Sequence, residues 1–280
     1  WLNVQGYTPH WHFTRIAPDG KIVLVGSICG SPDCTYERHL AVARMLADGT
    51  IDTSFSPASV TPGLAEYDIG GDVFHTAGAA IDSLGRILVT GRTSTDDTAV
   101  VRLLVDGAID TSFAASGLTP GIFKKSYGTN EQVQALALDA SERILVSGHV
   151  SNVPYVARLT VNGGTDFAFN AAGTSPGVIT LPQVDYGSAT GVQTDSLGRI
   201  VVAGIRKDVQ FLFNTGRIAH TEQTQPFVAR LTSGGIVDVT FNAFGTLKNT
   251  LAFKHQFSMQ TNREGNLLDP AIIGTGVLVP

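Results

Sequence analysis

One pattern occurs four times in this sequence and begins a fifth time. It consists of a polar turn, an apolar run and a glycine. The four complete copies and the incomplete fifth stand at 17–26, 82–91, 139–148, 195–204 and 262–268. Self-similarity with a period of about 55 to 70 residues, built from short apolar runs, is typical of proteins that repeat one small sheet around or along an axis. The repeat therefore constrains the architecture of this chain more than its function.

Two further elements follow each complete copy in a fixed order. The first is an apolar run that carries an arginine, and the second is an Asp-x-x-Phe motif. The arginines are Arg44, Arg102, Arg158 and Arg230, the aspartates are Asp52, Asp110, Asp166 and Asp238, and the phenylalanines are Phe55, Phe113, Phe169 and Phe241. We expect the arginines to pair with acidic residues of nearby turns and the phenylalanines to fill the space between neighbouring units. An anion-binding ring of arginines is the functional alternative.

The unit that follows Glu131 shows how one repeat is expected to fold. Apolar or alternating runs at 133–138, 143–147, 155–160 and 177–181 predict four strands, separated by turns and one variable loop. The first run is rich in small residues. Small side chains suit the innermost strand of a propeller blade, because such strands crowd around a central channel.

The order of these elements resembles the delta-60 repeat family. The pattern of that family is an Asp-x-x-Gly-Arg-Ile-Leu-Val-x-Gly core followed by Ala-Arg-Leu, Asp-Gly and Asp-x-x-Phe. The resemblance covers about residues 2–276 and implies a β-propeller, but it implies no particular reaction, because a fold does not determine a function. Two departures stand out. Glu142 replaces the turn glycine of the third unit, and the fifth unit lacks a recognisable Ala-Arg-Leu strand.

We therefore predict an all-β protein, a β-propeller of five four-stranded blades closed by its N-terminal strand. Five turns in one continuous repeat favour a single domain. The blades are expected at about 8–67, 68–127, 128–186, 187–253 and 254–280 together with 1–7. Residues 2–7 align with the fourth strand at 122–127 of a preceding unit, so they are expected to enter the last blade. A third strand of that blade is unclear, and either residues 271–279 or another chain would supply it.

Composition narrows the classes of partner. Charged residues make up 15% of the chain and the formal net charge is -5, without the basic stripes that nucleic-acid binding needs, so nucleic acid is not expected as a partner. The apolar runs are far shorter than the roughly 20 residues that span a bilayer, so no transmembrane segment is expected. The chain opens on Trp1 without a leader, and has few lysines and two cysteines. We interpret this as a processed protein that is secreted, periplasmic or on the cell surface.

The two cysteines, Cys29 and Cys34, flank a Gly-Ser-Pro-Asp turn. Such a turn can bring the two Cα atoms to the roughly 4.4 to 6.8 Å that a disulfide requires. We predict a disulfide, which fits an oxidising compartment. A pair of free thiols is the alternative, and a zinc site is disfavoured because no second ligand pair stands at the usual spacing.

Histidines recur at one position of the repeat. The residues seven positions before the start of each turn pattern are His10, His75, Gln132, Ser188 and His255. The three histidines belong to blades that become neighbours in a closed ring, so we predict that they converge on one channel mouth, with His12 two residues beyond His10 on the same strand face. Such imidazoles could bind Zn, Cu or Fe. A polar mouth without a ligand and a hydrogen-bonding site for an organic ligand are the alternatives.

The connections between second and third strands vary from unit to unit and are expected on the same face as these histidines. The longest, at 206–225, contains its own hairpin signal. Its residues Phe211, Phe213, His220 and Glu222 are predicted to cap the channel or dock a partner, because loops on a rigid scaffold carry binding. A solvated insertion is the alternative.

The sequence leaves any catalytic residue unknown and contains no cofactor-binding motif. It lacks a Gly-x-Ser-x-Gly nucleophile, a His-Glu-x-x-His motif and a phosphate-binding glycine loop. We predict a secreted binding module that recognises a protein or a glycan through its loop-rich face. The alternatives are a metal-dependent enzyme with the histidine site at the channel mouth, and a structural subunit whose last blade is completed by another chain.

Overall fold

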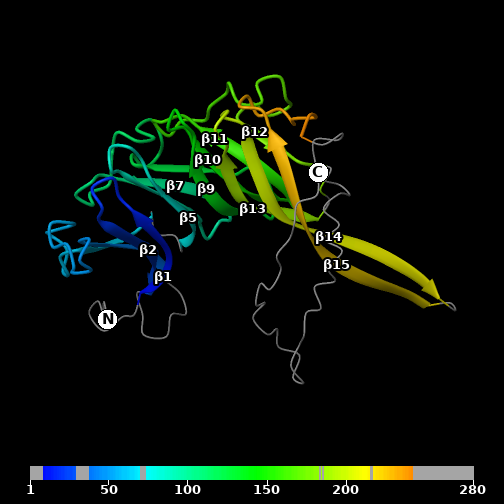
Figure 1. Cartoon of the computed structure of the whole chain (residues 1–280). Helices are drawn as coiled ribbons and strands as arrows, with labels where there is room; N and C mark the ends of the chain where they lie inside the picture. The colour runs from blue at the N-terminus through cyan, green and yellow to red at the C-terminus, as the bar shows by residue number, and fades with distance from the viewer. Residues whose placement is uncertain are drawn as a thin grey trace. The chain divides into compact units, whose positions relative to one another are not determined.

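The structure is a computed structural model, and it describes residues 9–29, 38–69, 74–182, 184, 186–214 and 217–241. Within these ranges the chain forms fifteen strands in four antiparallel sheets and no helix (Figure 1). The sheets follow one another along the chain in the order of the repeat. Strands therefore form where the apolar runs of the sequence predict them.

Each sheet is a simple meander in which every strand pairs antiparallel with the next strand of the chain. The first contains β1 (His10–Ile16), β2 (Ile22–Cys29), β3 (Arg38–Met45) and β4 (Leu64–Tyr67). The second contains β5 (His75–Ile81), β6 (Ile87–Arg92), β7 (Thr98–Leu103) and β8 (Ile122–Lys125). The third contains β9 (Gln132–Leu138), β10 (Ile144–Val150), β11 (Val153–Leu159) and β12 (Val178–Thr180). The described part of the fourth contains β13 (Gly187–Thr194), β14 (Ile200–Asn214) and β15 (Arg217–Leu231).

The turn between the first two strands of a sheet is closed by its aspartate. In the second sheet, Oδ1 of Asp82 accepts hydrogen bonds from the backbone N–H groups of Leu84 at 3.0 Å and Arg86 at 2.9 Å. Its Oδ2 pairs with Nε of Arg86 at 2.6 Å. Gly85 completes the turn with φ of 77°, a conformation that glycine adopts without steric cost. The Asp-x-x-Gly-Arg signature is thus a turn motif.

Glu142, which departs from this signature, has a structural role of its own. It adopts φ of 60°, the left-handed conformation that favours glycine, at the place of the turn glycine. Its Oε1 accepts a hydrogen bond at 2.6 Å from the backbone N–H of Ser83, in the equivalent turn of the second sheet. The side chain therefore joins two neighbouring turns where a glycine would join nothing.

The first strand of every sheet contains a β-bulge at the same position of the repeat. The residues left without a partner in the ladder to the second strand are His12, Ala77, Gln134 and Thr190. Each stands five residues before the start of its turn pattern. Because a bulge bends a strand and changes the direction of a side chain, the four sheets share one irregularity on their innermost strands.

Neighbouring sheets pack face to face through apolar side chains. One core cluster joins the first and second sheets, a second joins the second and third, and a third joins the third and fourth. The innermost strands β1, β5, β9 and β13 contact one another in chain order. This is the arrangement of consecutive propeller blades around an axis.

The repeated arginine and phenylalanine form a joint between neighbouring sheets. Arg102 pairs through Nε with Oδ2 of Asp110 at 2.7 Å and lies over the ring of Phe113, 4.7 Å from its centroid. Its Nη1 donates at 2.6 Å to the carbonyl oxygen of Val161 in the third sheet. A Cβ on Gly163, beside that carbonyl, would lie 2.7 Å from the ring of Phe113. The side chains of one sheet thereby hold a turn of the next.

The same joint recurs between the first and second and between the third and fourth sheets. Arg44 donates to the carbonyl of Val105, and Arg158 donates to that of Ser233. The expected ion pairs are confirmed, since all four arginines lie 2.7 Å from their aspartates. Burial favours the neutral acid, but hydrogen bonds from Ser54 and Arg44 lower the pKa of Asp52 to about 2. The arginines are therefore structural cations.

Candidate functional site

In each sheet, the first strand begins at the same end at which the second strand connects to the third. The antiparallel ladders show this directly, because His10 lies opposite Ser27, His75 opposite Arg92, and Gln132 opposite His149. We call this side the loop face. The sequence-based expectation that the histidines and the variable connections share one face is confirmed for the described residues.

The loop face contains polar contacts between neighbouring sheets. Nδ1 of His12, the bulged residue of β1, hydrogen bonds to Oγ1 of Thr76 on β5. Nδ1 of His149 on β10 lies 3.0 Å from Oγ of Ser188 on β13. Burial lowers the pKa of His149, and the nearby positive charge of Arg92 lowers it further. His149 is thus held in its neutral form near neutral pH.

The predicted metal site is only partly within the described residues. His10 is exposed and His75 is partly buried, each at the start of its strand, whereas His255 lies outside the described ranges. Among the side chains that the structure describes, no three His, Cys, Asp or Glu residues come together as a metal-binding group. The site at His10, His75 and His255, with His12 beside it, stays a prediction. The predicted disulfide has the same standing, because Cys34 is also outside these ranges.

The longest connection of the loop face is a β-ribbon. Strands β14 and β15 remain paired beyond the last residue that pairs with β13, from Lys207 opposite Thr224 to Asn214 opposite Arg217. Figure 1 shows the two strands extending together away from the sheets. The hairpin signal of the sequence is confirmed. For 208–214 and 217–223 the structure describes the backbone, so the partner-binding role of Phe211 stays a prediction.

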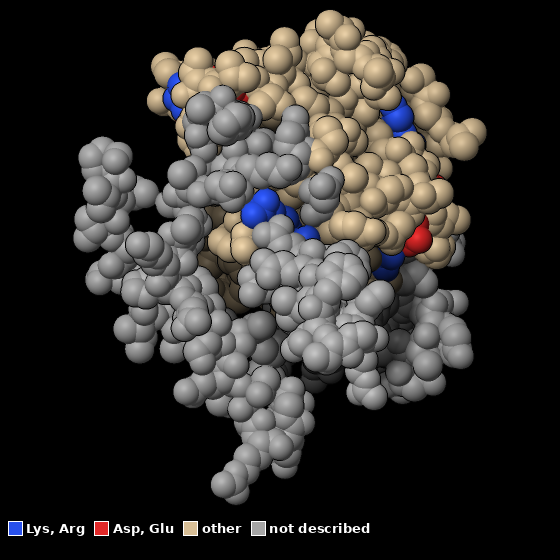
Figure 2. Space-filling view, turned by 90° about the vertical axis from the view of Figure 1, so that its right-hand side faces the viewer, with Lys and Arg blue, Asp and Glu red and all other residues tan. Residues whose placement is uncertain are grey.

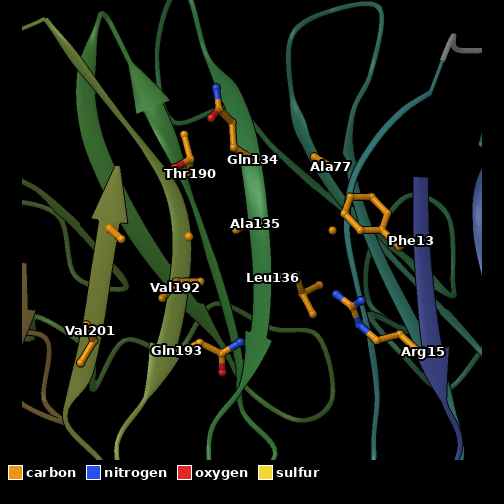
Figure 3. A pocket seen from close by; sticks show the side chains of 13 residues that line it. Phe13, Arg15, Ala77, Gln134, Ala135, Leu136, Thr190, Val192, Gln193 and Val201 are labelled. Carbon is orange, nitrogen blue, oxygen red and sulfur yellow. The ribbon is translucent and has the colours of Figure 1, made fainter. Parts of the chain in front are cut away.

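A hollow lies between the innermost strands of all four sheets. It has a volume of about 340 Å³, and we call it the inner hollow (Figure 3). Its lining is contributed by β1, β5, β9 and β13, together with two residues of β14. Most of the lining residues are small, but Phe13 and Arg15 project into it from β1. Three of the four bulged residues, Ala77, Gln134 and Thr190, lie on its wall.

A buried polar cluster around Glu131, between the second and third sheets, was not predicted from the sequence. Glu131 is 1% exposed, and its carboxylate accepts hydrogen bonds from the hydroxyl of Thr98 and, at 2.5 Å, from the backbone N–H of Tyr127. The hydroxyl of Tyr155 lies 2.8 Å from that of Thr98. Burial raises the pKa of Glu131 despite these hydrogen bonds, and the charge of Asp97 raises it further.

The repeat contained a signal for this cluster. Glu131 stands eight residues before the start of its turn pattern, where the second unit has the fully buried Phe74. Likewise, Thr98 stands where the first unit has the fully buried Leu40. Two apolar residues of one sheet interface are thus replaced by an acid and a hydroxyl in the next. Comparing the units position by position would have found them.

The described surface carries few charges in the view of Figure 2, where Lys, Arg, Asp and Glu are scattered among uncharged residues. Nothing in the described ranges is a helix long and apolar enough to cross a membrane. The loop-face contacts, the ribbon and the inner hollow are therefore the features on which a function of this chain can be argued.

Comparison with known families identifies the repeat. Residues 17–55 and 85–113 match a family described as a β-propeller domain of unknown function, DUF5122. Two segments of the chain therefore match the DUF5122 β-propeller domain. Each matched segment ends on the phenylalanine of an Asp-x-x-Phe motif, so the DUF5122 match includes the joint residues of the first two sheets. No curated protein has a sequence that matches the chain.

Three solved structures are similar to this chain. A protein provisionally assigned as a gluconolactonase is 17% identical with a TM-score of 0.36, over 79% of this chain and 60% of that one. A protein of unknown function from Bacteroides caccae is 11% identical with a TM-score of 0.35, over 84% of each chain. A mannose phosphorylase from Leishmania mexicana is 12% identical with a TM-score of 0.38, over 83% and 70%. The chain thus spans 60% of the length of the first of these proteins.

Proposed function

We propose that this chain is a secreted β-propeller binding module that recognises a protein or glycan partner through its loop face. The observation that supports this most is the ribbon of β14 and β15. The corresponding connection of the third sheet needs only Ser151 and Asn152 to turn from β10 to β11, whereas the fourth sheet extends two paired strands for eight further residues each, 207–214 and 217–224. A two-stranded ribbon is marginally stable in water on its own. A partner that covers it would supply the missing burial.

The register places the predicted binding residues on one side of the ribbon. Alternate residues of a strand share a face, and residues directly opposite each other share it too. Phe211 is opposite His220, Phe213 is opposite Ile218, and Val209 is opposite Glu222. The other face carries Gln210 opposite Thr221, Leu212 opposite Ala219 and Asn214 opposite Arg217. The two phenylalanines of the ribbon are therefore on one face, and the other face is mainly polar.

Replacing the ribbon tests this function. A variant in which 207–224 are replaced by the Ser-Asn turn of the third sheet should keep its thermal unfolding transition, because the ribbon lies beyond the paired strands of the sheet. It should lose binding that the wild type shows on a glycan array or to a panel of purified extracellular proteins. Equal binding by both chains would place recognition elsewhere.

Point variants separate the two faces of the ribbon. Phe211→Ser with Phe213→Ser should weaken the same binding at least about tenfold, because buried aromatic side chains dominate interface energies. Gln210→Ala with Thr221→Ala, on the opposite face, is the matched control and should leave binding within about twofold. Loss of binding in the control alone would contradict the proposed orientation.

We further propose that the ring contains five blades and closes through the N-terminal residues. The support is that no described sheet packs against the outer-facing side of the fourth sheet. Leu88 and Leu145, the sixth residues after the start of their turn patterns, are buried against the following sheet, whereas the equivalent Val201 of the fourth sheet is only half-buried. The fourth joint is also more open, since the side chain of Arg230 is 14% exposed against 2% for Arg102. A further blade built from the residues after Phe241 would cover this face.

A further inference from the structure

The first sheet places larger residues in the inner hollow than the other sheets have at equivalent positions. Four residues before the start of the turn pattern, the second, third and fourth sheets have Gly78, Ala135 and Gly191, while the first has Phe13. Two residues before it, the second and third sheets have alanine and the first has Arg15. The small residues leave a space, and the first sheet places an aromatic ring and a guanidinium in it (Figure 3).

Arg15 has no partner of opposite charge among the described residues. Its Nε donates to the carbonyl oxygen of Ala79 on β5 at 2.7 Å, and its Nη1 donates to that of Thr14 at 2.9 Å. The repeated arginines, by contrast, each pair with an aspartate. Among the described residues that line the hollow, Arg15 alone is charged. A guanidinium held in place without a carboxylate is suited to bind one from a ligand.

The rest of the lining indicates what else the ligand carries. Gln134 and Gln193 offer amide donors and acceptors, and Thr190 offers a hydroxyl. The ring of Phe13 lies beside the guanidinium, and the centroid of the ring is 5.7 Å from the guanidinium carbon of Arg15. The volume of about 340 Å³ is within the range of small-molecule sites. An aromatic ring, a cation and uncharged polar groups together suit a compact hydroxylated acid.

We propose that the inner hollow binds a small hydroxylated organic carboxylate, with the carboxylate on Arg15, the carbon skeleton on Phe13 and the hydroxyl groups on Gln134, Thr190 and Gln193. This site lies between the innermost strands and does not involve the ribbon. It is therefore separate from the partner recognition proposed for the loop face. A chain lacking the ribbon should bind the acid as the wild type does.

D-Glucuronate and its neutral analogue D-glucuronamide are the probes, measured by isothermal titration calorimetry and by NMR shifts of the full chain. The wild type should bind glucuronate and discriminate against glucuronamide. Arg15→Gln should weaken glucuronate binding about tenfold to a hundredfold, because a charge-assisted hydrogen-bond pair is lost. Arg199→Gln, which removes a guanidinium from a turn outside the hollow, is the control and should bind as the wild type does.

A second variant tests the space itself without touching Arg15. An added Cβ at Gly191 meets no atom within 4 Å, so Gly191→Val should fill part of the hollow without disturbing the strands and should abolish binding. Matching unfolding temperatures would show that each variant is folded. The proposal is overturned if the wild type fails to bind glucuronate, if it binds glucuronamide equally, or if either hollow variant binds like the wild type.

Discussion

At the scale of single residues, the most unusual group is the buried carboxyl of Glu131. A carboxyl whose pKa is raised in the folded state takes up a proton more readily there than in the unfolded chain. Its contribution to stability is therefore complete below its ordinary pKa of 4.5 and is lost as the pH rises through the folded value. Asp52 acts in the opposite sense, since its pKa is lowered to about 2 and its contribution is lost only in strong acid.

Glu131→Gln tests this assignment. Glutamine cannot ionise and keeps one acceptor oxygen, whereas the carboxylate accepts from Thr98 through Oε1 and from Tyr127 through Oε2. We expect the free energy of unfolding of the wild type to fall relative to the variant as the pH rises from about 4.5 toward neutrality. Urea titrations of both proteins across that range measure the difference. Parallel pH profiles would show that Glu131 does not titrate there.

At the scale of elements, the strands of the repeat could be predicted because each apolar run is bounded by a turn. Strands β9 and β10 begin within one residue of the predicted starts at 133 and 143. The bulges could not be predicted, because the extra residue of a bulge leaves the composition of the strand unchanged. Arg15 was missed for a related reason, since only the pairing of all four sheets shows that it faces a shared hollow.

The aspartates of the turn motif differ in burial, so replacing them should lower the stability of the protein by different amounts. The side chain of Asp82 is 3% exposed and that of Asp195 is 24% exposed, although both make the same three hydrogen bonds in their turns. Asp82→Ala should destabilise the protein by about 1.5 to 3 kcal/mol, because a buried charged acceptor is lost. Asp195→Ala should cost less than Asp82→Ala, because solvent screens the more exposed pair. Chemical denaturation of the two variants compares them, and equal costs would refute the argument.

At the scale of the whole molecule, the number of blades and the closure of the ring are open to a direct test. If a fifth blade covers the fourth sheet, Val201→Asp should cost about 2 kcal/mol or more, because it buries an unpaired charge. Leu197→Asp, at a turn position that is 72% exposed, should change stability by less than about 0.5 kcal/mol.

Measuring these variants at several protein concentrations also shows whether the same chain or a second chain covers the fourth sheet at Val201. A cost for Val201→Asp that is independent of protein concentration supports coverage by the same chain. A cost that appears only at high concentration would mean that a second chain completes the ring, as a structural subunit would require. Costs that are small for both variants at every concentration would mean that solvent covers the face and that the five-blade arrangement is wrong.

The joint between sheets has a further consequence, for how such a chain can lengthen in evolution. The second and third units each carry both halves of the joint, the arginine and phenylalanine that reach forward and the glycine and carbonyl that receive them: Arg102 with Gly107 in the second sheet and Arg158 with Gly163 in the third. A gene segment that encodes one unit, once duplicated in place, would encode a sheet that already fits both of its neighbours. Gain or loss of whole blades therefore requires no compensating substitution at the joints, and relatives of this chain can differ in blade number while keeping the same repeat.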